Sequence, residues 1–233
     1  MSGTAAQDHR TVWPRTHDGL LSWVRDDHAV ADVRRYFAVP DPDDPTAPAF
    51  SGSRFEALGG GGDREGTADE VTADDLVAVT LLSVDVPPHV ALALLEGRLG
   101  PQLTEQLRRV PREASIVTEA GRSFLADDGP LDRAWQALNR RTGMGYVTTS
   151  KLLARKRPHL VPVWDQVVRC ALGTPVRPWT WLGERFSDPE LPAALRRVRE
   201  AAGVPATVSE LRVLDVVLWT GHAAYHRRGR CPG

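Results

Sequence analysis

A short turn with two glycines, Gly143-Met144-Gly145, precedes a segment whose pattern predicts a helix over residues 147–155. Glycine accepts positive φ angles and leaves the backbone uncovered, so the N–H groups of the turn and of the helix start are expected to point outward. A helix start of this kind binds anions, and a phosphate group is the expected ligand. Met144 is expected to point inward and to hold the two flanking helices together.

Asp165 is the carboxylate best placed to do chemistry, because it stands in Pro162-Val-Trp-Asp165-Gln at the start of a predicted helix over residues 165–172. A carboxylate beside a developing positive charge stabilises that charge directly. Aspartate is also a preferred N-cap, and an N-cap needs no chemistry. The sequence leaves both roles open.

Two histidines and two cysteines are the other side chains with metal-binding atoms. His222 and His226 lie four residues apart on a predicted helix, a spacing that can bind one metal ion. The sequence shows no third ligand, which favours a structural or solvent-exposed role. Cys170 and Cys231 are too few for a four-cysteine metal site, an iron–sulfur cluster or a disulfide framework. We therefore expect no metal, no cofactor and a protein of the cytoplasm.

The charge of the chain is small overall but unevenly distributed. Its 233 residues are 42% hydrophobic, enough for a sizeable core, and its net charge of −1 by itself argues against nucleic-acid binding. Residues 131–233, however, hold 17 basic and 8 acidic residues, whereas residues 1–130 hold 12 basic and 22 acidic residues. The basic half is compatible with a phosphate-binding face and equally with an ordinary solvated surface.

Helical periodicity and capping residues predict a mainly helical chain. Thr72 is expected to cap a helix that carries Asp74 and Asp75 in its first turn. Strand signals are few and confined to the first sixty residues, where residues 50–55 are expected to be extended and the proline-rich residues 40–48 irregular. Gly59–Gly62 lacks the Lys-Ser/Thr of a phosphate loop and is expected to form a linker or a tight loop. Further helices are expected over residues 20–36, 89–96, 104–110, 116–125, 131–141, 147–155, 165–172, 179–186, 191–202 and 208–225.

The turn and the aspartate together resemble the helix-hairpin-helix DNA glycosylase superfamily. The hairpin consensus of that superfamily is apolar–Pro–Gly–apolar–Gly–x–x–Thr–Ala, with Thr142 here in place of the proline and Thr149 in place of the alanine. Asp165 follows Val147 by 18 residues, the interval that separates the hairpin from the catalytic aspartate in that superfamily. Asp74–Ser83 is a weaker match to an early helix that ends in Leu-Ser. A DNA-wedging glutamine follows there, whereas this chain has Val84-Asp85.

This resemblance implies a helical glycosylase-like region over residues 67–233, with the helix-hairpin-helix at residues 131–156, preceded by a region over residues 1–66 that holds one helix and an irregular segment. It implies a monofunctional DNA glycosylase that excises a base from duplex DNA after the base has flipped out, with Asp165 as the catalytic residue. Bifunctional members carry a lysine where Val147 stands, so we expect no β-lyase activity. Trp164 is expected to stack on the flipped base. The expected contacts with DNA are Gly143, Gly145, Thr148, Lys151, Arg155, Lys156 and Arg157.

Two further functions remain open. The chain could be a DNA-binding protein that has lost the chemistry, because the wedge glutamine and the lyase lysine are missing. It could also be a repurposed enzyme that acts on a nucleoside or another small-molecule ligand near Asp165, since a fold does not fix a function. Residues 40–65 resemble an uncharacterised bacterial family, which implies no activity. The sequence shows no membrane-spanning segment and no secretory signal.

Overall fold

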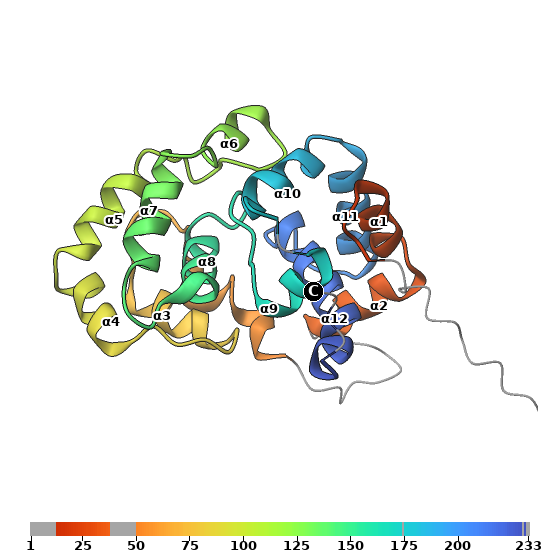
Figure 1. The fold of residues 1–233 in the computed structure, drawn as a ribbon, viewed down its shortest axis with the longest axis horizontal. Helices are drawn as coiled ribbons and strands as arrows, with labels where there is room; N and C mark the ends of the chain where they lie inside the picture. The colour runs from red at the N-terminus through yellow and green to blue at the C-terminus, as the bar shows by residue number, and fades with distance from the viewer. Residues whose placement is uncertain (1–12, 38–49, 174, 230, 232–233) are drawn as a thin grey trace, which may run out of the picture.

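The computed structural model describes residues 13–37, 50–173, 175–229 and 231. These residues form α-helices and short 3-10 turns, with no β-strand among them, so the predicted mainly α fold is confirmed. None of the helices that the structure describes combines the length and the apolar character needed to cross a membrane. In Figure 1 the helices form two groups that lie side by side.

The first group follows the middle of the chain. Within it α8 packs against α3 and α7, and α5 packs against α4 and α7. Helix α8 is its centre, because every residue from Thr148 to Lys156 is buried. The helices on this side of Figure 1 are α3 (Ala73–Thr80), α4 (Pro88–Leu95), α5 (Leu99–Leu107), α6 (Glu119–Ser123), α7 (Pro130–Asn139) and α8 (Gly145–Lys156).

The second group joins the two ends of the described chain. Helix α12 packs against α2, α9 and α11, and α1 packs against α11. The helix of the predicted region 1–66 therefore packs on the end of the predicted region 67–233. The helices of this group are α1 (His17–Val24), α2 (Asp27–Tyr36), α9 (Gln166–Leu172), α10 (Pro178–Phe186), α11 (Glu190–Ala201) and α12 (Glu210–Arg227).

Two local predictions near the N-terminus are wrong. Residues 20–36 are two helices, because the Asp26 carboxylate accepts the backbone N–H of His28 at 2.9 Å and caps a new helix, α2. Residues 50–55 are not extended, since Ser51–Arg54 forms the 3-10 turn η2. The proline-rich residues 40–48 lie outside the described part of the chain.

Candidate active site

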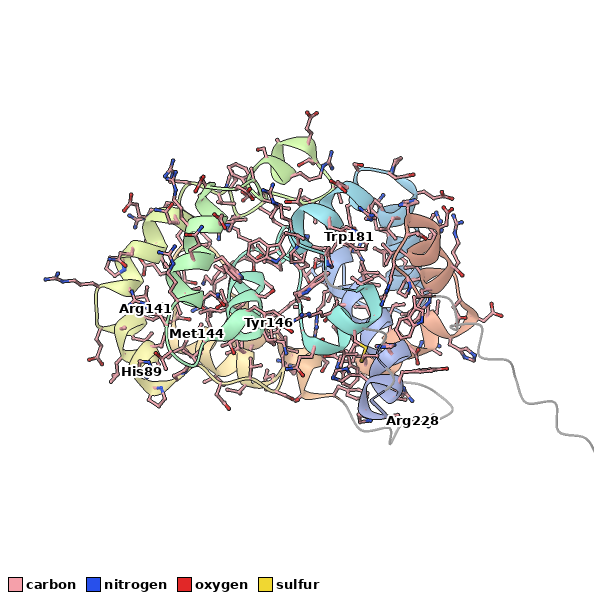
Figure 2. All side chains as sticks on the ribbon, in the orientation of Figure 1. His89, Arg141, Met144, Tyr146, Trp181 and Arg228 are labelled. Carbon is pink, nitrogen blue, oxygen red and sulfur yellow. A yellow bond between two sulfur atoms is a disulfide. The ribbon has the colours of Figure 1, made fainter. Side chains whose placement is uncertain are left out.

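The glycine turn joins α7 to α8 as the sequence predicts. Gly143 and Gly145 have φ angles of +84° and +54°, values that side chains disfavour. Met144 is 1% exposed, which confirms its inward position. Among the described residues, no side chain caps the start of α8, so its first N–H groups stay free of side-chain partners. Arg141, Met144 and Tyr146, which lie around this turn, are labelled in Figure 2.

The structure contradicts the predicted DNA contacts at the other end of α8. Arg155, Lys156 and Arg157 are at most 1% exposed, and a buried side chain cannot touch a phosphate. Asp75 accepts both Arg155 Nε at 3.0 Å and Lys156 Nζ at 2.9 Å, and all three side chains are fully buried. Arg157 donates to Asp69 at 2.6 Å and to four backbone carbonyls. This basic run is part of the protein interior, where each cation has a carboxylate partner and two of them share Asp75.

Arg155 also fixes the glycine loop. Its guanidinium donates to the carbonyls of Phe55, Glu56 and Leu58. A Cβ atom on Gly62 would lie 2.3 Å from the carbonyl oxygen of Arg155, so only glycine fits there. Gly59–Gly62 is therefore a tight loop that closes over Arg155.

Asp165 is both a helix cap and a cavity residue. One of its oxygens, Oδ1, accepts the backbone N–H groups of Val167 and Val168 at 2.9 Å each and so caps α9. The other, Oδ2, lies 3.9 Å from Lys151 Nζ, and the Asp165 side chain is 15% exposed. The cap therefore uses one oxygen of the carboxylate, and the other oxygen faces Lys151.

Lys151 is also not a surface lysine, which contradicts its predicted contact with phosphate. It is 4% exposed and donates to the carbonyl of Leu82, at the end of the α3 segment, at 2.8 Å. Burial lowers the pKa of Lys151, and the charge of Asp165 opposes that effect. Thr148 is 7% exposed, which leaves it little surface for a phosphate.

A small cavity of about 170 Å³ lies in front of Asp165 and Lys151. Arg212 and Asp215 of α12 form a buried ion pair in its wall, and Arg212 also donates to the hydroxyl of Tyr36 at 2.7 Å. Burial raises the pKa of Asp215 to about 6, and the charge of Arg212 opposes the shift. The aromatic residues of the wall are Tyr36, Phe50 and Trp219.

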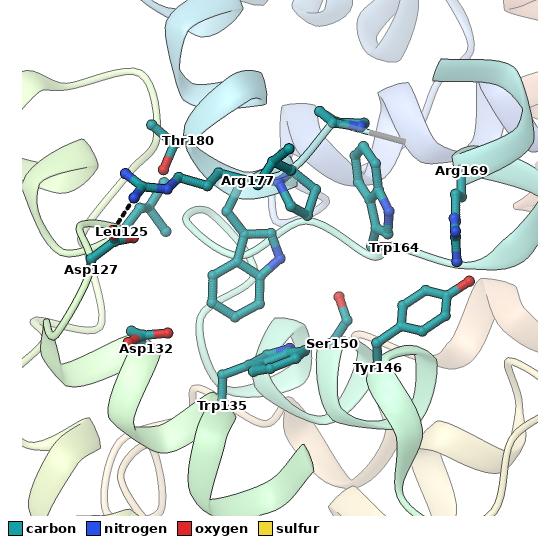
Figure 3. A pocket seen from close by; sticks show the side chains of 14 residues that line it. Leu125, Asp127, Asp132, Trp135, Tyr146, Ser150, Trp164, Arg169, Arg177 and Thr180 are labelled. Atoms are coloured by element: carbon teal, nitrogen blue, oxygen red, sulfur yellow. Dashed lines mark ion pairs between the residues drawn. The ribbon is translucent and has the colours of Figure 1, made fainter. Parts of the chain in front are cut away.

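A second, larger cavity of about 520 Å³ opens on the other side of α8. Trp164 lines this cavity and not that of Asp165, so neighbours in sequence face different spaces. Figure 3 shows Trp135, Tyr146 and Trp164 around it, with Arg169 and an ion pair between Arg177 and Asp127 at the rim. Trp179 and Asp132 complete its aromatic and acidic lining.

The arrangement can hold a polar group between an ammonium and a carboxylate, and can place aromatic faces beside it. The sequence analysis missed Lys151, Arg212, Asp215 and Tyr36 as members of one site. An Arg–Asp pair three residues apart within the apolar run of α12, Leu211–Trp219, was the signal that could have identified two of them.

A disulfide joins Cys170 to Cys231, a pairing that the sequence analysis did not predict. His222 lies 2.8 Å from Cys170 Sγ and His226 lies 3.0 Å from Cys231 Sγ. Packing of α9 against α12 thus brings Cys170, distant in the chain, beside His222.

One comparison with known proteins gives a match. The model of a family described as "Family of unknown function (DUF6308)" matches residues 29–222. No curated protein and no solved structure matches the chain. The matched stretch contains Asp165, Lys151, Arg212 and Asp215.

Proposed function

The chain belongs to the DUF6308 family, whose function is unknown, and we propose that it is a glycosylase-like protein that hydrolyses an N-glycosidic bond in DNA with Asp165 as its catalytic carboxylate. The observation that carries the proposal is that the two carboxylate oxygens of Asp165 have different partners. Oδ1 holds the start of α9, and Oδ2 stands at the cavity, 3.9 Å from Lys151 Nζ. The cap thus fixes the carboxylate in position and leaves Oδ2 available for the proposed reaction.

In the proposed reaction the bond between the sugar C1′ and the base nitrogen breaks, and the base leaves with the electron pair. Asp165 stabilises the positive charge that develops on the sugar. A water molecule adds its oxygen to C1′, and its proton goes to the departing base. A flipped nucleotide is required, because neither Asp165 nor the cavity wall can enter a base stack.

The N–H groups at the start of α8, which no described side chain caps, are proposed to bind a backbone phosphate beside the flipped nucleotide. Arg140 and Arg141, at the end of α7, are exposed next to the glycine turn before α8 and add positive charge. They replace the buried Arg155, Lys156 and Arg157 as the candidate contacts with DNA.

Lys151 gives the proposal a second measurable feature. Bifunctional members of the superfamily that this chain resembles carry their lyase lysine at the position of Val147. Here the amine of a different residue, Lys151, lies beside Asp165. Burial lowers the pKa of Lys151, the charge of Asp165 opposes that shift, and an amine attacks a sugar aldehyde only after it has lost its proton. Trapping with borohydride therefore belongs in the assay, and a covalent adduct lost in Lys151→Met would assign lyase chemistry to this residue.

The test is release of bases from duplex DNA that carries a panel of modified bases. Asparagine is also a good N-cap, so Asp165→Asn removes the charge but keeps the helix start. We expect base release to fall at least about 100-fold in this variant. Asp127→Asn, at the rim of the larger cavity, is the matched control and is expected to keep full activity. Equal release by the wild type and Asp165→Asn would reject the proposed role, and salt-sensitive DNA binding without any release would indicate a binding protein.

The larger cavity favours a second candidate, an enzyme or binding protein for a nucleoside-like small molecule. Trp135, Trp164 and Trp179 line about 520 Å³ of space, with Arg169 and Arg177 beside them. Aromatic faces stack on planar bases and arginines pair with phosphate. Titration of the chain with nucleosides and nucleotides, followed by tryptophan fluorescence, tests this candidate. Saturable quenching that Trp135→Ala abolishes, together with no DNA binding at low salt, would favour it over base excision.

A further inference from the structure

Four side chains with metal-binding atoms meet where α9 packs against α12. Cys170 comes from α9, His222 and His226 come from α12, and Cys231 follows α12. Cys170 Sγ lies 2.8 Å from His222 Nε2, and Cys231 Sγ lies 3.0 Å from His226 Nδ1. The two sulfurs are joined in a disulfide that links residues 61 apart in the chain. Each sulfur therefore has an imidazole nitrogen of its own.

This pairing is not what a disulfide requires. A sulfur is a weak hydrogen-bond acceptor, so a disulfide gains little from an imidazole at each end. Two thiolates and two imidazoles are, in contrast, a common donor set for a structural zinc ion. Cys170 Sγ, Cys231 Sγ and a ring nitrogen of His226 lie within 4.8 Å of one another. Ligand atoms on a tetrahedral zinc are about 3.3–3.8 Å apart, so shifts on the order of an ångström suffice for these three ligands once the sulfurs are separate, and His222 beside Cys170 offers the fourth.

The surroundings of the four side chains suit a metal ligand set. His222 is 1% exposed, and its ring packs edge-on against Trp13 and parallel to Tyr225. His226 and Cys231 are half-buried, so an ion has access from solvent.

We propose that the dithiol form of this chain binds one Zn²⁺ through Cys170 Sγ, Cys231 Sγ, His222 Nε2 and His226 Nδ1, and that the disulfide is the oxidised state of the same site. Binding replaces the protons of the two thiols, so one Zn²⁺ enters and two H⁺ leave. Oxidation by a peroxide reverses the loading. The two thiolates give two electrons to hydrogen peroxide, the S–S bond forms, Zn²⁺ is released and two hydroxide ions result.

The site ties the C-terminal segment to the helix that carries Asp165. Cys170 follows Asp165 by five residues, and the histidines lie on α12 together with Arg212 and Asp215. Zinc would therefore hold α9, which Asp165 caps, to α12, whose Arg212 and Asp215 line the smaller cavity. The inference does not depend on base excision, since it concerns only the four ligands.

The first test is metal binding by the full chain, reduced with a phosphine, freed of metal by a chelator and handled without oxygen. We expect one equivalent of Zn²⁺ to bind, and Co²⁺ in its place to give the visible absorption of a tetrahedral thiolate complex. Cys231→Ser and His226→Ala are expected to weaken Zn²⁺ binding at least about 100-fold, because each removes one of four ligands. The matched control is His28→Ala, which changes an exposed histidine of α2 and is expected to bind Zn²⁺ like the wild type.

The second test follows oxidation and protein stability together. Peroxide is expected to release one Zn²⁺ for every two thiols lost, and Zn²⁺ is expected to raise the melting temperature of the reduced wild type but not of Cys231→Ser. X-ray absorption of the loaded protein should show two sulfur and two nitrogen neighbours. The proposal is overturned if the reduced chain binds Zn²⁺ no more tightly than Cys231→Ser, or if Zn²⁺ stays bound after the disulfide has formed.

Discussion

Lys151 Nζ lies 3.9 Å from Asp165 Oδ2 across the mouth of a cavity of about 170 Å³. The two residues reach this position from different elements, one from the middle of α8 and one from the cap of α9. Because Lys151 also donates to the carbonyl of Leu82, its ammonium is held by one neutral and one charged acceptor. The pair gives the cavity both signs of charge at one point, and this polarity underlies the proposed chemistry.

The cap and the chemistry of Asp165 are separable by substitution. Asp165→Ala removes the oxygen that accepts from Val167 and Val168, and we expect it to lower the free energy of unfolding by about 1 kcal/mol. Asp165→Asn is expected to change this free energy by a few tenths of a kcal/mol, since asparagine caps equally well. Urea unfolding followed by circular dichroism measures both. A loss in Asp165→Asn as large as in Asp165→Ala would mean that the charge, and not the cap, stabilises α9.

The buried cations of α8 depend on Asp75. Asp75→Asn leaves Arg155 and Lys156 with no full negative charge among their hydrogen-bond partners in the described structure, and burial of an unpaired charge is costly. We expect a loss of about 3–5 kcal/mol in the free energy of unfolding. Asp74→Asn is the matched control at the neighbouring position, where the carboxylate is half-exposed and lies 3.6 Å from Arg64. Its expected cost is below about 1 kcal/mol, and equal losses in both variants would contradict the argument.

Glu56 makes the stability of the protein depend on pH. Its Oε2 atom is buried without a hydrogen-bond partner in the described structure, and burial raises the pKa of this carboxyl from 4.5 to about 8. The folded chain therefore holds a proton on Glu56 that the unfolded chain releases above about pH 4.5. The free energy of unfolding should fall, relative to Glu56→Gln, as the pH rises from 4.5 to 8, by up to about 5 kcal/mol, because one pKa unit corresponds to about 1.4 kcal/mol. Parallel pH profiles for the wild type and Glu56→Gln, measured by chemical unfolding, would disprove this.

DNA binding, if it occurs through the turn, depends on the exposed arginines beside it. Arg141→Ala is expected to weaken binding to duplex DNA and to reduce the slope of log affinity against log salt by about 1. Arg228, also exposed but at the far end of the molecule in Figure 2, is the control and its substitution by alanine should leave the slope unchanged. Fluorescence anisotropy at several salt concentrations gives both slopes. Equal effects of the two substitutions would point to unspecific attraction.

The sequence by itself determined the helices and the glycine turn, because these depend on local chemistry. Apolar periodicity and caps such as Thr72 and Ser209 act within one or two turns, and α3 and α7 to α12 lie close to their predicted ranges. The positive φ angles of Gly143 and Gly145 and the buried Met144 follow from the same local pattern.

Only the tertiary structure decided which charges face solvent and which side chains share a site. Arg155, Lys156 and Arg157 form a basic run that predicts a surface, yet inside the protein they pair with Asp75 and Asp69, some eighty to ninety residues away. Packing of α8, α9 and α12 brings Lys151 beside Asp165 and brings the cysteines beside the histidines. The energy of a buried charge is set by partners distant in the chain, and a local pattern carries no information about them.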